Sequence, residues 1–280
     1  MASTTAKDEA LTPPEETKRI AGVSVVLTWP SSASKDTPVK GVTFLITGAM
    51  VSISEYNGLR DIILEKKHLV VGLFMNPLWP LRNNHRRKAE DVKNVFQELR
   101  SSMERDESMQ LPDSYSIVGH SMGGKVSLLV ASVADPEHVT AVLALDPVDI
   151  NPVEFTNEDG PNLPLSNDKS KDTSGSDEGH GMTTPTTALS SRHISIVLTC
   201  TDGGKGIPKA HNGEAIHKLH PSTTYYRHEH AGHMCYCDHG GGWAGKLMPD
   251  VGSPEGNEAA RKSAKELIRK LLMDSASGNR

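Results

Sequence analysis

Strand-like and helix-like segments alternate along most of this chain, and the alternation limits the possible folds more than any other feature. The strand-like runs are short, apolar and rich in β-branched residues, as buried strands are. The helix-like segments between them repeat apolar residues every three or four positions. Strand-like runs occupy residues 23–29, 42–47, 69–74, 115–118, 139–145, 194–198 and 225–228, and helix-like segments occupy 56–63, 89–99, 126–130 and 259–272. This order predicts an α/β fold with a mostly parallel central sheet and helices on both faces.

Two polar segments interrupt the pattern and lower the apolar content of the chain. Only 36% of the 280 residues are hydrophobic and 4% are aromatic. Residues 1–21 are interpreted as a disordered tail, and residues 22–280 as one domain that carries a flexible polar insertion at about 151–192. The composition of the insertion suits a plain surface loop and a lid over a site equally. Without both segments about 215 residues remain, which suits one domain rather than two.

Charge, hydropathy and cysteine content exclude several classes of protein. The 30 Lys and Arg against 35 Asp and Glu give a net charge of −5, so we expect no nucleic-acid partner. No apolar run approaches the ~20 residues of a membrane-spanning helix. The three cysteines, Cys200, Cys235 and Cys237, cannot build a disulfide scaffold and favour a reducing compartment. Residues 1–18 lack the pattern of a secretory signal or a transit peptide, so we expect an intracellular protein.

A G-x-S-x-G pattern stands between a strand-like run and a helix-like segment, at Gly119-His120-Ser121-Met122-Gly123. This setting is the one that a nucleophile elbow requires, in which a strained turn presents a serine hydroxyl at the carboxyl edge of the sheet. Gly119 and Gly123 suit such a turn because they have no Cβ atom to clash. We therefore predict that Ser121 is a nucleophile.

A serine nucleophile needs a histidine base and a carboxylate that orients it. In folds of this kind the acid follows the serine, and the histidine follows the acid. Candidate bases near the last strand-like run are His228, His230, His233 and His239. We predict His233, because Gly232 before it lets a loop turn the ring inward. Candidate acids at strand ends are Asp146, Asp149 and Asp202, and their spacing does not decide among them.

Ester cleavage by a serine also needs donors for the oxyanion of the tetrahedral intermediate. One donor is expected from the backbone N–H of Met122, directly after the nucleophile. The other is expected from the loop after the strand-like run 42–47, where we propose the N–H of Ala49.

A metal site is the rival interpretation of the histidine-rich segment. Six possible zinc ligands lie within twelve residues, namely His228, His230, His233, Cys235, Cys237 and His239. Zinc sites usually take ligand pairs two to four residues apart in two clusters, whereas these residues are mostly separated by one. We therefore expect no metal and no other cofactor.

Three motifs resemble those of the chlorophyllases, a family of α/β-hydrolases. Residues 119–125 are similar to the family's GHSRGGK segment, and residues 145–149 to its DPVDG segment. Residues 232–234, followed by Asp238, are similar to its GHMDMLDD segment. The resemblance spans about residues 42–250. It implies Ser121 as nucleophile, Asp146 as acid and His233 as base, with Asp202 as the alternative acid that spacing allows.

The same resemblance implies a substrate and also marks departures from the family. Chlorophyllases cleave the phytyl ester of chlorophyll. A plastid location would fit this substrate, so both the cytoplasm and the plastid stay open as compartments. Met122 stands where the family has arginine, Cys235-Tyr236-Cys237 stands where it has Asp-Met-Leu, and the loop after Gly48 lacks its His-Gly-Thr pattern. We thus expect a serine-dependent carboxylic ester hydrolase that acts on chlorophyll or a similar bulky, lipid-like ester. The alternatives are a lipase or esterase of another substrate class and a non-catalytic binding protein.

Overall fold

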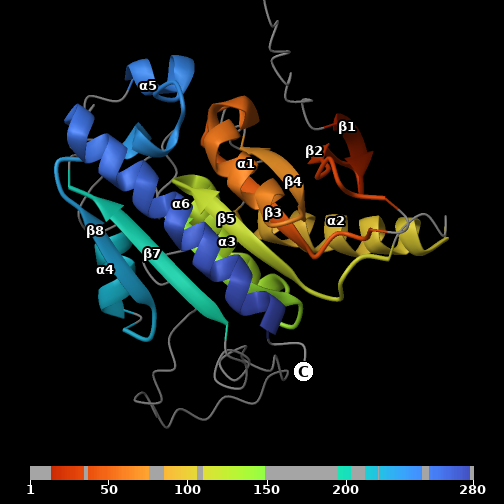
Figure 1. Cartoon of the computed structure of the whole chain (residues 1–280). Coiled ribbons are helices and arrows are strands. Elements are labelled where there is room, and N and C mark those ends of the chain that lie inside the picture. The colour runs from red at the N-terminus through yellow and green to blue at the C-terminus, as the bar shows by residue number, and fades with distance from the viewer. Residues whose placement is uncertain are drawn as a thin grey trace, which may run out of the picture.

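The computed structural model describes residues 14–34, 37–75, 85–105, 110–148, 194–202, 212–219, 221–247 and 252–277. These residues form one eight-stranded sheet with the strand order β1-β2-β4-β3-β5-β6-β7-β8 (Figure 1). The strands from β4 to β8 in this order are parallel to one another. β1 and β2 join the β4 edge in antiparallel pairs. The predicted α/β fold with a mostly parallel sheet is confirmed.

The helices and strands follow the predicted alternation. The strands are β1 Glu15–Ile20, β2 Val23–Thr28, β3 Gly41–Ala49, β4 His68–Met75, β5 Tyr115–His120, β6 Val139–Leu145, β7 Ser195–Thr201 and β8 Thr224–His228. The helical elements are η1 Ile53–Tyr56, α1 Asn57–Glu65, α2 His85–Arg105, α3 Met122–Leu129, η3 Val130–Ala134, α4 Gly213–Leu219, η6 His233–Tyr236, α5 Gly242–Leu247 and α6 Pro254–Ser277. Of the helices that the structure describes, none is both long and apolar enough to cross a bilayer.

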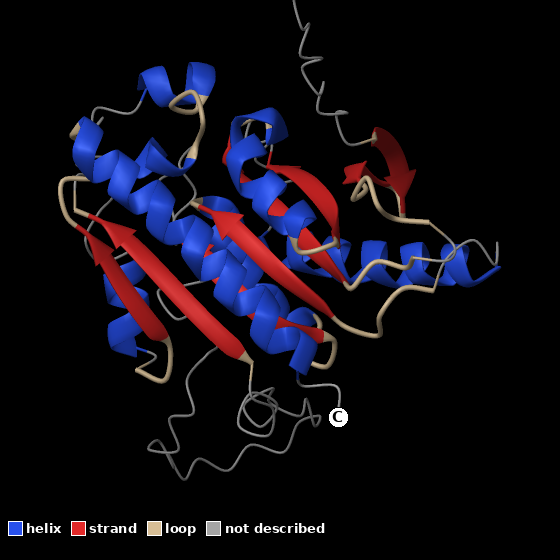
Figure 2. Cartoon of the chain, viewed as in Figure 1, coloured by secondary structure: helices blue, strands red, loops and turns tan. Residues whose placement is uncertain are grey.

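Helices cover both faces of the sheet (Figure 2). Each face also has its own cluster of buried apolar side chains. α2, α3 and α4 cover one face, where Phe96 of α2 and Phe44 of β3 both pack against the ring of Tyr115. α1 and α6 cover the other, where Ile63 and Ile268 belong to the same buried cluster as Leu143 of β6. Because the central strands are covered on both sides, they appear in the sequence as continuous apolar runs rather than alternating ones.

The first strand, β1, lies within residues 1–21, which the sequence predicts to be a disordered tail. For residues 15–20 this prediction is wrong. Glu15–Ile20 form β1 and return through a turn at Ala21 and Gly22, which have φ values of 48° and 76°. β1 is an edge strand and its first five residues are exposed, so its polar sequence gave no apolar pattern to detect. Residues 1–13 and the predicted insertion at 151–192 lie outside the described residues.

Phe44 and Phe74 offer a matched test of the core. Phe44 is fully buried on β3, and its ring meets Tyr115 edge-on at 5.0 Å between centroids, whereas Phe74 near the end of β4 is 48% exposed. We expect Phe44→Ala to lower the free energy of unfolding by about 3–5 kcal/mol, because it leaves a cavity. Phe74→Ala should cost less than about 1 kcal/mol. Urea unfolding of both variants measures the difference, and equal losses would contradict this description of the core.

Candidate active site

Ser121 occupies a strained turn between β5 and α3. Its φ of 56° and ψ of −121° lie in a region that residues with side chains rarely adopt. The turn closes because Gly119 and Gly123, two residues away on either side, lack side chains. A methyl group on Gly119 would lie 2.2 Å from Ser127 Oγ, and one on Gly123 would lie 2.4 Å from the carbonyl oxygen of Ile46. The strand–turn–helix setting predicted for Ser121 is therefore present.

Hydrogen bonds connect Ser121 with His233 and Asp146. His233 Nδ1 lies 2.7 Å from Asp146 Oδ2, and His233 Nε2 lies 2.9 Å from Ser121 Oγ. A carboxylate can only accept, so Nδ1 carries the ring hydrogen and Nε2 is left to accept from the serine hydroxyl. Ser121 is 9% exposed and His233 3%, which shields the three groups from bulk water. Such an arrangement can activate a serine hydroxyl as a nucleophile.

Asp146 is held as a carboxylate at the end of β6. Thr201, the last residue of β7, donates its N–H to Oδ1 at 3.2 Å and its hydroxyl to Oδ2 at 2.6 Å. Burial alone would raise the pKa of Asp146, but the hydrogen bond and charge of His233 and the bonds from Thr201 outweigh it and lower the pKa below its ordinary value. No local sequence pattern marks Thr201 as a partner of Asp146. Only the pairing of β6 with β7 places it beside Asp146.

Asp202, the alternative acid, serves the neighbouring loop instead. Its Oδ1 accepts the N–H of His230 at 2.6 Å, and its Oδ2 lies 3.9 Å from the guanidinium of Arg227. Its carboxylate is not bonded to His233, whose Nδ1 is taken by Asp146. Asp149, the remaining candidate, lies outside the described residues. The geometry favours Asp146 as the partner of His233.

The loop after His233 is anchored to the start of α1. Asp238 Oδ2 accepts the N–H of Gly58 at 2.8 Å, and the N–H of Asp238 donates to the carbonyl oxygen of Glu55 at 2.7 Å. The Glu55 carboxylate accepts the N–H groups of His239 and Gly241 at 3.1 and 3.2 Å. Asp238 therefore holds the loop that carries His233, at a distance from the serine.

The segments that carry the predicted oxyanion donors are in contact. Met122 begins α3 and Ala49 ends β3. A methyl group on Gly48 would lie 3.4 Å from Cβ of Ser121, so the end of β3 abuts the serine. The N-terminus of α3 also brings a partial positive charge to this position. Developing negative charge on a substrate oxygen would be stabilised there.

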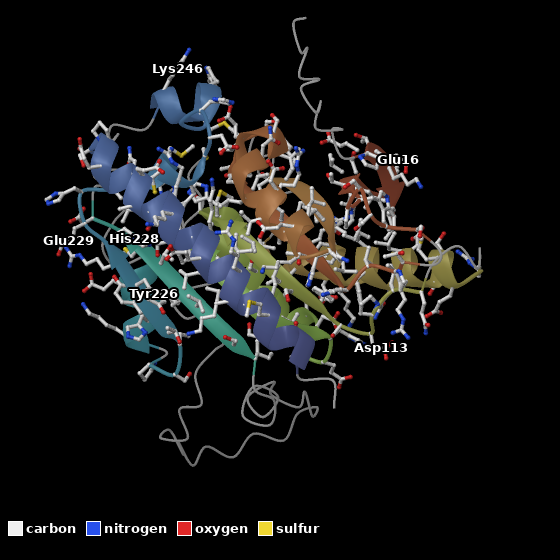
Figure 3. The ribbon with its side chains drawn as sticks, viewed as in Figure 1. Glu16, Asp113, Tyr226, His228, Glu229 and Lys246 are labelled. Atoms are coloured by element: carbon white, nitrogen blue, oxygen red, sulfur yellow. The ribbon has the colours of Figure 1, made fainter. Side chains whose placement is uncertain are left out.

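The six residues considered as zinc ligands are dispersed. Cys235 and Cys237 are free thiols buried against α1 and α6, where burial raises the pKa of Cys237 to about 12. His230 and His239 are exposed, and His228 lies on β8 (Figure 3). In the part of the chain that the structure describes, no three His, Cys, Asp or Glu side chains are grouped to hold a metal ion.

Comparisons with known proteins agree with this architecture. A family model described as PGAP1-like alpha/beta domain matches residues 83–198, which include Ser121 and Asp146. The solved structure of TT1662 from Thermus thermophilus superposes with a TM-score of 0.55 at 16% identity, over 96% of this chain and 100% of that one. A predicted CIB-like hydrolase from Thermoplasma acidophilum gives 0.54 at 13% identity, over 92% and 99% of the two chains. This chain has the α/β-hydrolase fold.

The superposed part covers nearly the whole of both chains in each of these pairs. The esterase domain of a Rhodothermus marinus protein superposes with a TM-score of 0.52 at 12% identity, over 94% of this chain and 99% of that one. No curated protein matches the chain by sequence. Identities this low concern the fold alone. They support the α/β-hydrolase part of the predicted resemblance, whereas the chlorophyllase part stays a prediction.

Replacing each carboxylate with an amide in turn tests whether Asp146 or Asp202 orients His233. We expect Asp146→Asn to slow labelling of Ser121 by a fluorophosphonate by about 10³–10⁴-fold, because an amide no longer holds His233 with Nε2 free to accept. Asp202→Asn should change the rate less than about threefold, because this carboxylate bonds the backbone of His230. Labelling rates read on intact protein by mass spectrometry provide the measurement. A larger effect at Asp202 would assign the acid to that residue.

Buried histidines make the stability depend on pH. Burial, with a smaller effect of Lys40, lowers the pKa of His68 to about 4, and burial together with His233 lowers that of His120 to about 3. In the unfolded chain both take up protons near ~6.5. Between about pH 6.5 and 4 the unfolded state binds more protons, so the free energy of unfolding falls as the pH falls. We expect His68→Gln to flatten this decline in urea unfolding at pH 7 and 4.5, and an unchanged slope would refute the claim.

Proposed function

We propose that this chain is a carboxylic ester hydrolase that uses Ser121 as its nucleophile. The observation that carries the proposal is the continuous hydrogen-bonded path from Ser121 through His233 to Asp146, with separations of 2.9 and 2.7 Å. The path lies at the carboxyl edge of an α/β-hydrolase sheet, where this fold places its chemistry. The esterase and hydrolase neighbours in structure support the same reaction class.

The reaction proceeds in two halves. In the first half His233 Nε2 takes the proton of Ser121 Oγ while Oγ attacks the ester carbonyl carbon, and Asp146 stabilises the imidazolium that forms. The tetrahedral intermediate collapses, His233 gives the proton to the leaving alcohol, and an acyl-enzyme remains. In the second half His233 takes a proton from water, the hydroxide adds to the acyl carbon, and Ser121 leaves with that proton. The ester and one water become an acid and an alcohol.

Backbone N–H groups at the turn supply the electrostatic stabilisation. We assign this role to Met122, which follows the nucleophile, and to Ala49, at the end of β3. Each such donor contributes about 3 kcal/mol to transition-state stabilisation. The contact between the end of β3 and Ser121 supports the assignment.

The chlorophyllase-like motifs extend the proposal to the substrate. They favour the phytyl ester of chlorophyll, or a similar ester of a bulky, lipid-like alcohol. The motifs lie at 119–125, 145–149 and 232–234. Residues 119–125 and 232–234 contain the proposed nucleophile and base, so the part of the resemblance that bears on chemistry coincides with the hydrogen-bonded path.

A substrate panel with a matched pair of variants tests the proposal. Ser121→Ala should lower hydrolysis of p-nitrophenyl acetate, p-nitrophenyl palmitate and chlorophyll by about 10⁴-fold or more, because no oxygen nucleophile remains. Ser116→Ala is the control. Ser116 is also buried on β5, but it bonds Thr140 at 3.1 Å toward the opposite end of the strand. Rates for both variants are compared by absorbance and by chromatography of the products.

The panel also separates the alternatives. Activity that survives in Ser121→Ala would refute a serine mechanism, and activity lost to a chelator and restored by zinc would indicate a metal enzyme. Hydrolysis of the palmitate but not of chlorophyll would assign a lipase or esterase of another substrate class. No hydrolysis and no fluorophosphonate labelling of Ser121 would leave the non-catalytic binding protein.

A further inference from the structure

His120 directly precedes Ser121, is fully buried and takes no part in the path to Asp146. Its Nδ1 lies 2.8 Å from the hydroxyl of Tyr56, and its Nε2 lies 3.0 Å from the main-chain oxygen of His233. The same Tyr56 hydroxyl lies 2.9 Å from the backbone nitrogen of Gly48. One imidazole thus connects the end of β3, the turn of the nucleophile and the loop of the base.

The direction of every bond in this connection follows from the groups themselves. A main-chain carbonyl oxygen only accepts, so His120 Nε2 carries the ring hydrogen and donates to His233. The neutral ring then has a bare Nδ1, which accepts from the hydroxyl of Tyr56. The hydroxyl oxygen is left to accept the N–H of Gly48. Burial lowers the pKa of His120 to about 3, so the ring stays neutral and the order does not reverse near neutral pH.

We propose that His120 and Tyr56 are positioning residues that hold the oxyanion donors and the base in register with Ser121. This inference rests on the proposed ester hydrolysis. Tyr56 holds the N–H of Gly48, so that group is not available to a substrate, and the chain at this point is fixed with Ala49 next in line. His120 holds the backbone of His233 on the other side. Bonds that run in one direction also polarise one another and stiffen the connection.

The position of the ring explains why its effect should be on the reaction rate. The ring of His120 lies 4.8 Å from that of His233 and 5.6 Å from that of Tyr236, measured between centroids. Neither Tyr56 nor His120 exposes surface through which a substrate could bind. A 1 Å misplacement of reacting groups lowers the rate about 10²-fold. Small shifts between nucleophile, base and oxyanion donors should therefore lower kcat.

Two substitutions of His120 test its two hydrogen bonds separately. We call the bond to the Tyr56 hydroxyl the Tyr56 arm and the bond to the His233 carbonyl oxygen the His233 arm. Asn places its amide at the position of Nδ1, so His120→Asn keeps a partner for Tyr56 and loses the bond to His233. Gln places its amide at the position of Nε2, so His120→Gln keeps the bond to His233 and loses the partner of Tyr56. Tyr56→Phe removes the Tyr56 arm from its other end.

The expected result is a loss of kcat at nearly constant KM. We expect Tyr56→Phe and His120→Gln each to lower kcat for p-nitrophenyl acetate by about 10- to 100-fold, with KM within about threefold. The double variant should lose no more than either single variant, because both cut the same arm. His120→Asn should add to the loss in Tyr56→Phe, because it cuts the other arm.

Controls come from the amino ends of β4 and β5, at the opposite end of the parallel strands from Ser121. Tyr115 is a buried tyrosine whose hydroxyl donates to Asp135 at 3.0 Å, and His68 is a buried histidine bonded to Thr43 at 2.9 Å. Tyr115→Phe and His68→Gln therefore remove comparable buried hydrogen bonds far from Ser121. They should lower thermal stability about as much as the test variants and leave kcat within about twofold.

A spectroscopic measurement on the wild type supports the test if a variant fails to fold. Nitrogen-15 shifts of labelled histidine should show His120 as the neutral Nε2–H form from pH 5 to 9, and Tyr56→Phe should move the shift of its bare Nδ1. An Nδ1–H or charged ring would overturn the inference. So would kcat values in Tyr56→Phe and His120→Gln that equal those of the controls. Failure of the proposed function is distinct, because wild type and Ser121→Ala would then hydrolyse ester equally slowly, and the inference would fail with it.

Discussion

The close approach of α3 to the ends of β3 and β5 is the constraint on which the rest of the site depends. Gly119 and Gly123 permit it, because a Cβ atom at either position would lie within 2.4 Å of another atom. The approach forces Ser121 into its left-handed conformation and directs the hydroxyl out of the sheet edge toward His233. It also places the first turn of α3 beside the end of β3. The same steric requirement therefore positions the proposed nucleophile, the N-terminus of α3 and the proposed oxyanion donors together.

Hydrogen-bond partners, acting against burial, decide which groups at this edge carry charge. Burial disfavours the ionised form of both Asp146 and His120. Asp146 receives donors from His233 and Thr201, and these outweigh burial, so the carboxylate stays charged. His120 has no carboxylate partner among the bonds it makes, and it stays neutral with one donor and one acceptor in use. Two buried groups in one site thus reach opposite states for reasons that lie in their partners.

Much of this arrangement could be predicted from the sequence, and the omissions have physical causes. The central strands were predictable because burial on both faces makes them continuous apolar runs, as in β3 and β6. The turn at Ser121 was predictable because its glycines are required by local sterics. β1 was not, because an exposed edge strand needs no apolar face. Thr201, Tyr56 and His120 were missed because their roles come from strand order and from contacts across 55, 64 and 113 positions of the chain, which no local pattern records.

The Met122 side chain is buried, so it offers almost no surface to a substrate. This position differs from the arginine of the chlorophyllase motif, yet the Met122 side chain is 1% exposed and packs in the layer with α2. A guanidinium there would need a buried partner or would have to turn out of that layer. The Met122 side chain therefore belongs to the core, and under the proposed mechanism only its backbone N–H would act in the site. Under the proposed ester hydrolysis, the choice among esters would therefore rest on side chains other than that of Met122.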